Sequence, residues 1–347
     1  MEKVRERNGK VIVVEKVEET TEVIEVDPYS APEAVQERII EDKEVPIDAK
    51  INDMNGLADY IEKNPYLMSD SDRVKIREAI QIGEIGEKDI REIGAPLRER
   101  YNEIHEEGDN ALQQISDERT ELVRQGTYSK DAESLEIIRQ DFADLREREN
   151  EIRMSLTPAE TMKKVLSETR ETGPAENDAG QLYADDSAKN VIIALDKTRE
   201  GLPTDWIERS NDETIKAKQA LRGYFMHDGE TSTIALSGGR GMNRCAYHEM
   251  GHHIENLYPE IKKLEHEFYN RRTEGEKLRW LGLGYSLNEK TRYDNFVDPY
   301  MGKDYGNRED SGYEVLSMGM EGMYTGSYDM KKDPEYQDFI FGILSSI

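Results

Sequence analysis

The stretch CAYHEMGHHIENLY, residues 245–258, decides how the rest of the chain is interpreted. It contains the pattern His-Glu-x-x-His, with His248 and His252 four residues apart and Glu249 directly after the first histidine. Residues four apart on an α-helix lie on one face about one turn apart, so both imidazoles can reach one metal ion. Glu249 then lies beside the metal, where it can take a proton from water. The pattern predicts a zinc site on a helix.

Features around the motif help to decide between a metal site and a polar surface helix that happens to carry histidines. In a glutamate-rich chain with 6 histidines, the pattern arises by accident roughly one time in a hundred, so alone it is a hypothesis. Gly251 inside the helix costs about 1 kcal/mol relative to alanine, which indicates that a neighbouring element packs closely there. A strand candidate at Thr231–Leu236 and the glycine-rich connector SGGRGMN precede the helix. This context favours the metal site.

The other histidines receive no ligand role. His253 follows a ligand directly and faces about 100° away from it on the helix, which is typical of a supporting or surface histidine. His105, His227 and His266 are scattered along the chain.

A catalytic zinc site needs a third protein ligand, with water in the fourth position. The metzincin pattern would require glycine at position 255 and histidine at position 258, where this chain has Glu255 and Tyr258. The segment GYEVLSMGMEGMY offers Glu314 at the head of an apolar helix, whose burial would carry the carboxylate into the interior. Glu321, seven residues on and on the same face, is a second candidate. Asp304 in GKDYG is a third.

These residues together carry a resemblance to a known family. HEMGHHIE, followed further along by YEVLSMGMEGMY, resembles the zincin-type metallopeptidase domain of phage and prophage head-morphogenesis proteins, and more distantly the anthrax lethal-factor-like gluzincins. In those toxins a Glu-x-x-Ala-Glu helix supplies the third ligand, and Glu314 to Met318 falls on that pattern. Met318 departs from it, because the toxins have a second carboxylate there. The resemblance covers residues 190–330 and not the N-terminal half.

The resemblance implies a Zn²⁺-dependent endopeptidase with His248, His252 and Glu314 as metal ligands and Glu249 as general base. The substrate would be a polypeptide. The peptidase would process virion proteins or act as a secreted effector or toxin. One alternative is a head-associated structural or scaffolding protein that keeps the zincin fold without peptidase activity. The other is an interaction protein without metal, in which the motif is accidental.

The resemblance also implies roles ahead of each active-site helix. An aromatic hydroxyl near the metal is expected in the family, and in the stretch YMGKDYG this points to Tyr305 as the group that stabilises the oxyanion, with Tyr313 behind it. A tyrosine packed in a loop is the alternative for Tyr305. Zincin sites resemble one another in having an edge strand before the motif helix, so Thr231–Leu236 is expected to pair with an extended peptide.

Composition limits the partners. The 347 residues are 35% charged with a net charge of −27, which argues against a nucleic-acid-binding surface and against an anionic membrane surface. The single cysteine, Cys245, excludes an intrachain disulfide. No apolar run is long enough for a signal peptide or a membrane span. We expect a protein of the host cytoplasm or the virion, whose N-terminal half contacts phage head or portal proteins.

The hydrophobic pattern predicts a mostly helical α+β fold with three parts. Residues 1–31 form an extended acidic arm or β-hairpin, with a disordered acidic tail as the alternative. Residues 32–172 form a helical domain with a coiled-coil-like hairpin at 97–153. A composition break at 173–181 separates them from a zincin-like domain, residues 180–347, which has a small sheet and the active-site helices.

Shorter patterns predict individual elements. Ser69–Asp70–Ser71 offers N-caps for a helix that ends near Gln81, and Thr157 begins another helix with proline at the first helical position. NVIIAL at 190–195 is typical of a buried strand, and ETIKAKQALRG at 213–223 resembles a helix. Asp228–Gly229 is a hairpin-type turn.

Overall fold

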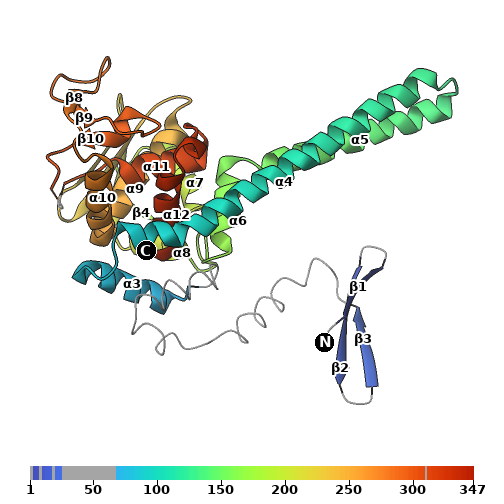
Figure 1. Ribbon diagram of the computed structural model, residues 1–347, viewed down its shortest axis with the longest axis horizontal. Coiled ribbons are helices and arrows are strands. Elements are labelled where there is room, and N and C mark those ends of the chain that lie inside the picture. Colours follow the sequence, from blue (N-terminus) through green and yellow to red (C-terminus); the bar gives the residue numbers. More distant parts are fainter. Residues whose placement is uncertain (1–2, 8–9, 18–19, 26–67, 309–310) are drawn as a thin grey trace. The chain divides into compact units, whose positions relative to one another are not determined.

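The computed structural model describes residues 3–7, 10–17, 20–25, 68–308 and 311–347. The chain divides into two compact units, Met1–Gly56 and Leu57–Ile347. The described part of the first is an antiparallel sheet in the order β1-β2-β3 (Figure 1). β2 and β3 pair as the antiparallel β-hairpin expected within residues 1–31, and β1 adds a third strand. The predicted helices before residue 68 lie outside the described residues. The strands are β1 (Lys3–Arg7), β2 (Lys10–Val17) and β3 (Thr20–Glu25).

The second unit begins with helices. Ser69 caps α3 through a reciprocal pair of hydrogen bonds with Asp72, which confirms the predicted start. The predicted hairpin is formed by α4 and α5, which extend together beyond the other elements of their unit (Figure 1). Ion pairs such as Arg148–Glu118 at 3.3 Å connect its two arms. The helices are α3 (Asp70–Ile82), α4 (Glu87–Tyr128), α5 (Ala132–Ser155) and α6 (Pro158–Ser167).

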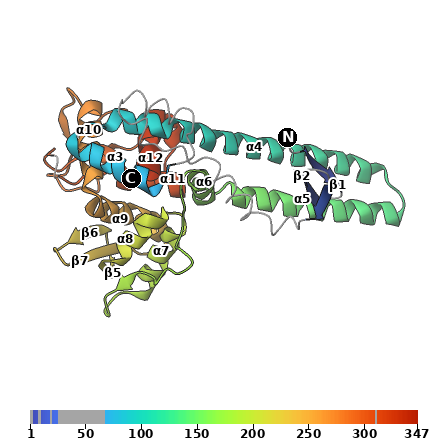
Figure 2. The same ribbon diagram turned by 90° about the horizontal axis from the view of Figure 1, so that it is seen from below.

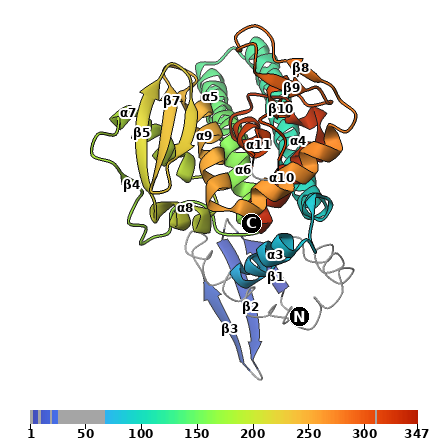
Figure 3. The same cartoon turned by 90° about the vertical axis from the view of Figure 1, so that its left-hand side faces the viewer.

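A mixed four-stranded sheet follows, in the order β4-β5-β7-β6. β5 runs parallel to β4 and β7, and β6 runs antiparallel to β7. One face of the sheet, which includes Ile215 and Ile234, is buried, whereas Lys216 and Lys218 on the other face are partly exposed. Figure 3 shows α9 beside this sheet. The elements are β4 (Leu182–Tyr183), α7 (Lys189–Arg199), α8 (Thr204–Asn211), β5 (Thr214–Ala220), β6 (Tyr224–His227) and β7 (Thr231–Ser237).

Two sequence predictions in this region were wrong. NVIIAL belongs to helix α7 and not to a strand: its buried residues recur at spacings of three and four, while Ile193 is 69% exposed. A run of apolar residues this short does not distinguish a buried strand from a helix. ETIKAKQALRG contains strand β5 and not a helix, because Ile215 and Ala217 are buried while the lysines between them face outward. That alternation has the period of a strand.

The predicted strand Thr231–Leu236 exists as β7, and the turn at Asp228–Gly229 joins it to β6. β7 is not an edge strand, however, because β5 and β6 flank it. The edge strand nearest the motif helix is β6. The edge of β7 that was expected to be free is paired with β6 in a hairpin.

The motif helix and its neighbours complete the unit. α9 packs against α11, and α12 lies along the base of α4 (Figure 2). A small antiparallel sheet in the order β10-β9-β8 lies between α10 and α11 in the chain. The elements are α9 (Met242–Leu257), α10 (Pro259–Arg272), β8 (Leu278–Trp280), β9 (Lys290–Arg292), the 3₁₀ helix η2 (Pro299–Gly302), β10 (Lys303–Asp304), α11 (Val315–Thr325), the 3₁₀ helix η3 (Met330–Lys332) and α12 (Pro334–Ser346).

The boundary predicted at residues 173–181 does not separate two packed units. α4 and α12 approach so closely that a side chain at Gly94 would overlap the carbonyl oxygen of Asp338, and one at Gly342 would overlap that of Ile90. Residues of α3, α4 and α6 share one hydrophobic core with those of α9 to α12. The fold is a mostly helical α+β fold with the core centred on these helices. Within the described residues, no helix has the length and apolar character needed to cross a membrane.

Candidate metal centre

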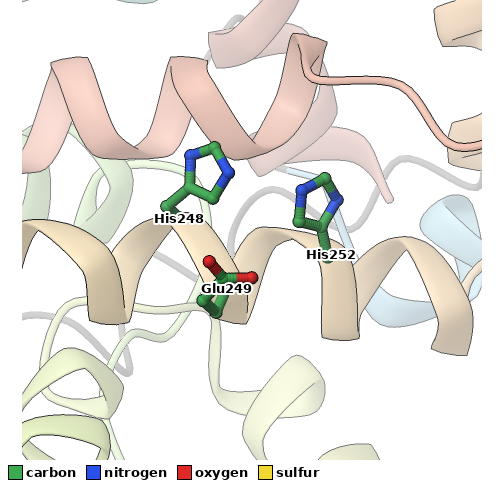
Figure 4. Close-up of side chains that lie close together, drawn as sticks. All are labelled: His248, Glu249 and His252. Carbon is green, nitrogen blue, oxygen red and sulfur yellow. The ribbon is translucent and has the colours of Figure 1, made fainter. Parts of the chain in front are cut away.

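Helix α9 presents the motif as the sequence predicted. His248, Glu249 and His252 place ligand atoms within 4.8 Å of one another, and Figure 4 shows both imidazole rings projecting from the same side of the helix. Gly251 faces α11: a Cβ there would lie 2.7 Å from the Cα of Ser317. The close packing inferred from this glycine is therefore present. It brings the two helices together at the level of the histidines.

Glu314 lies where the third ligand was predicted, at the N-cap of α11 and only 1% exposed. Its Oε2 atom is 3.1 Å from Nε2 of His248 and 3.2 Å from Nε2 of His252. The structure thus brings the three proposed ligands together around one point. Asp304, the third candidate, is held elsewhere, since its carboxylate accepts hydrogen bonds from Arg292 and from the backbone of Gly306.

The donor set fits zinc. Two neutral imidazoles and one carboxylate are a common catalytic zinc set, with bonds of about 2.0–2.2 Å. A tetrahedral ion with such bonds separates its ligand atoms by roughly 3.3 Å, close to the nitrogen–oxygen distances between Glu314 and the two histidines. An ion could therefore occupy this point after small side-chain movements.

The other nitrogen of each imidazole is also fixed by a carboxylate. Nδ1 of His248 donates to Glu321 at 3.1 Å, and Nδ1 of His252 donates to Glu255 at 3.1 Å. Such partners hold the tautomer in which Nε2 is the free ligand atom. Glu321, the second ligand candidate, thus orients His248. Glu255 was missed as a functional residue, although its position three residues after His252 on the same helix was a visible signal.

The charges around the two imidazoles favour a cation. Burial lowers the pKa of His248, but hydrogen bonds to Glu314 and Glu321 outweigh burial and raise it to about 9. The pKa of His252 is likewise raised, because Glu255 and Glu314 outweigh its burial. The pKa of Glu314 is lowered: burial would raise it, but the two histidines outweigh that effect. The same carboxylates that stabilise protons on the histidines here would stabilise a divalent ion.

Glu249 lies beside the ligands and is 4% exposed. Burial raises its pKa, against the opposing effect of the two histidines, and a raised pKa makes a carboxylate a better proton acceptor. The backbone of Gly223, just before β6, lies against this side chain: a Cβ there would overlap Oε1 of Glu249 and Sγ of Cys245. Gly223 therefore leaves the space in which the carboxylate sits.

Tyr305 is brought to the site but contacts a ligand. Its hydroxyl donates to Oε1 of Glu314 at 2.5 Å, and Nζ of Lys303 lies 3.7 Å from the same oxygen. Tyr313 points elsewhere, with its hydroxyl 2.6 Å from Nδ1 of His266. The oxyanion role of Tyr305 stays a prediction, while its observed contact holds Glu314.

Tyr300 is a second hydroxyl at the site that the sequence reasoning missed. It lines a pocket of about 360 Å³ together with His248 and Glu249, and Tyr305 does not. Its oxygen accepts hydrogen bonds from Arg222 at 3.2 Å and from Lys303 at 3.1 Å. The hydroxyl also hydrogen-bonds Glu314, and burial together with this carboxylate raises the pKa of Tyr300. The signal was a second tyrosine in YMGKDYG.

His253 is a structural residue. Its side chain is fully buried, with Nε2 2.8 Å from the hydroxyl of Ser210 and the ring against Phe225. Burial lowers its pKa to about 3, so it stays neutral. This matches the expectation that His253 is not a ligand.

The chain was compared with protein-family models, with curated proteins and with solved structures, and no match was found.

Proposed function

We propose that this chain is a zinc-dependent endopeptidase of the His-Glu-x-x-His…Glu type. The observation that carries the proposal is the convergence of both Nε2 atoms on Glu314, while both Nδ1 atoms are held by carboxylates. Zinc, when bound by His248, His252 and Glu314, would supply Lewis acidity that polarises a carbonyl and acidifies water. The resemblance to phage and prophage head-morphogenesis zincins agrees with this donor set.

The side chains around the metal position divide the remaining work. Glu249 would accept the proton of the attacking water and return it to the leaving amine. The hydroxyl of Tyr300, which hydrogen-bonds Glu314, would turn to donate to the oxygen on which negative charge develops, and Arg222 and Lys303 would support that hydroxyl. Tyr305 would hold Glu314 in its ligand orientation. Burial of Glu249 and Glu314 favours this, because preorganised groups act most strongly where water is excluded.

An extended polypeptide is the proposed substrate. β6 is one of the two edge strands of the four-stranded sheet, and Gly223 connects it directly to the pocket at Glu249. Three of its residues, Tyr224, Met226 and His227, are exposed. An exposed edge of this kind can pair with a peptide strand by main-chain hydrogen bonds.

The test is zinc content and peptide hydrolysis of the chain and of Glu249→Gln. We expect one zinc per chain in both proteins purified without chelator, and a loss of hydrolysis in the variant of roughly 10²–10⁴-fold, the contribution of a general base. Glu230→Gln, on the exposed turn between β6 and β7, is the matched control and should keep full activity. Well under one zinc per chain, with none loadable, would refute the proposal.

A structural role in a phage head is the second candidate. The observation that favours it is the α4–α5 hairpin, which extends away from the site with mostly exposed side chains. Such a hairpin could contact head or portal proteins whether or not the peptidase is active. A chain that holds zinc but cleaves no peptide, and that co-purifies with heads, would favour this function.

A further inference from the structure

The charged side chains that line the pocket beside the metal centre differ in whether they have an ion-pair partner. Besides His248 and Glu249, it is lined by two arginines, Arg222 and Arg244, and by the carboxylate of Asp298. The question is which of these charges remains available to a substrate side chain.

Both arginines already have carboxylate partners. Arg222 donates to Glu289 at 2.9 Å and lies over the ring of Tyr285, 5.5 Å from its centroid. Arg244 donates to Glu321 and lies over the ring of another pocket residue, Tyr328. Since each guanidinium is neutralised by a neighbour, neither offers a free positive charge to the pocket.

Asp298 has no such partner. It precedes η2, and its Oδ1 atom accepts a hydrogen bond from the backbone of Tyr300 at 2.8 Å. Among the residues that the structure describes, no cation forms an ion pair with it. Arg244 lies within longer electrostatic range, because Asp298 is among the groups that raise its pKa. Asp298 is therefore the pocket carboxylate that lacks a close ion-pair partner among the described residues, apart from the proton acceptor Glu249.

We infer that this pocket takes a positively charged side chain, and that the substrate class is a polypeptide with lysine or arginine next to the scissile bond. Asp298 would pair with the cation. The inference rests on the proposed function, because the pocket matters only if the metal centre cleaves peptides. The net charge of −27 adds long-range attraction for basic segments.

The experiment compares three peptides that differ only in the residue beside the scissile bond: arginine, glutamine or glutamate, tested on each side of the bond. The chain should cleave the arginine peptide with a kcat/KM roughly tenfold or more above that of the glutamine peptide, the effect of one charge-assisted hydrogen bond. Asp298→Asn should bring this ratio close to one. Asparagine also accepts from the backbone of Tyr300 and so retains the cap. Asp298→Lys should reverse the preference toward glutamate.

Asp212→Asn, an exposed residue after α8, makes the same charge change outside the pocket and should keep the arginine preference. Binding of labelled peptides to Glu249→Gln, measured by fluorescence anisotropy, reads the preference without turnover. No cleavage of any peptide would defeat the proposed function alone, since the binding assay still tests Asp298. Equal binding of all three peptides, a preference for glutamate, or an arginine preference that survives Asp298→Asn would each overturn the inference.

Discussion

Helices α11 and α5 belong to the same compact unit and differ almost completely in burial. α11 has 11 residues, and ten of them, from Val315 to Tyr324, are buried. α5 has 24 residues, and Leu145 alone is buried. α11 is surrounded by α6, α9, α10 and α12, whereas α5 packs mainly against α4 and to a smaller extent against α6.

The difference shows where the chain is constrained. Because α11 and its N-cap are buried against neighbours, Glu314 can contact both histidines of α9, and Glu321, two turns further on, can orient His248. In α5 most side chains face water, and pairs such as Arg139–Glu136 are exposed and contribute little to stability. Buried residues are therefore concentrated around the proposed metal centre, whereas few residues of the hairpin are buried.

The largest expected effect comes from removing the elements that surround α11. A fragment of residues 180–347 lacks α3, α4 and α6, which complete the core around α12 and α11. We expect no cooperative unfolding transition, because the apolar face of α12 would be exposed to water. Circular dichroism during denaturation measures this. A fragment that unfolds cooperatively and binds zinc would instead support the boundary at 173–181.

Substitutions at the two carboxylates of α11 should give the next largest effect. Glu314→Gln removes a ligand and should weaken zinc binding by more than roughly 100-fold, the upper range for supporting residues. Glu321→Gln disturbs only the orientation of His248 and should cost roughly 10–100-fold. Competition with a chromogenic chelator measures both. Glu136→Gln in α5 is the control, with no expected change. A greater loss of zinc affinity for Glu321→Gln than for Glu314→Gln would mean that Glu321 is the ligand and Glu314 the supporting residue.

One substitution at two places in α4 should have opposite signs. Gly94→Ala forces α4 away from Asp338 of α12 and should lower the free energy of unfolding by about 1–3 kcal/mol, the cost of overpacking. Gly126→Ala, in the hairpin, meets only Ile138 at 3.8 Å and should raise it by about 0.5–1 kcal/mol through helix propensity. Urea denaturation compares them. Equal effects would mean that the two ends of α4 are equally constrained.

Shortening the hairpin should have the smallest effect. Replacing residues 120–146 by a short glycine-serine loop joins the arms just beyond the Arg148–Glu118 pair. Zinc content should be unchanged and the melting temperature should shift by only a few degrees, since the removed segment contains little of the core. Differential scanning calorimetry and elemental analysis measure this. Loss of zinc would show that the hairpin supports the metal centre.

The sequence by itself determined the elements whose apolar residues recur with a clear period, because that period identifies both the type of element and its buried side. The hairpin of α4 and α5 was predicted because apolar residues at spacings of three and four mark one face of each helix. The spacing of His248 and His252 likewise defines one face of α9. Glu314 was predicted because a carboxylate heads an apolar helix. In each case the information lies within one or two turns of chain.

The tertiary structure decided what depends on contacts between distant segments. NVIIAL is short enough to fit either period, and packing selected the helix. ETIKAKQALRG alternates with the period of a strand over Ile215 and Ala217, and pairing with β4 and β7 made that segment β5. The shared core arises from Gly94 and Gly342, which let α4 and α12 approach closely, and glycine carries no hydrophobic pattern. The same holds at the site. Glu321 and Tyr300 both lie in segments that the sequence analysis singled out. Glu321 contacts His248, and Tyr300 lines the pocket, only because α11 and η2 approach α9 in the folded chain. The spacing of residues along the chain does not encode such positions in space, and these positions determine the partner of a side chain.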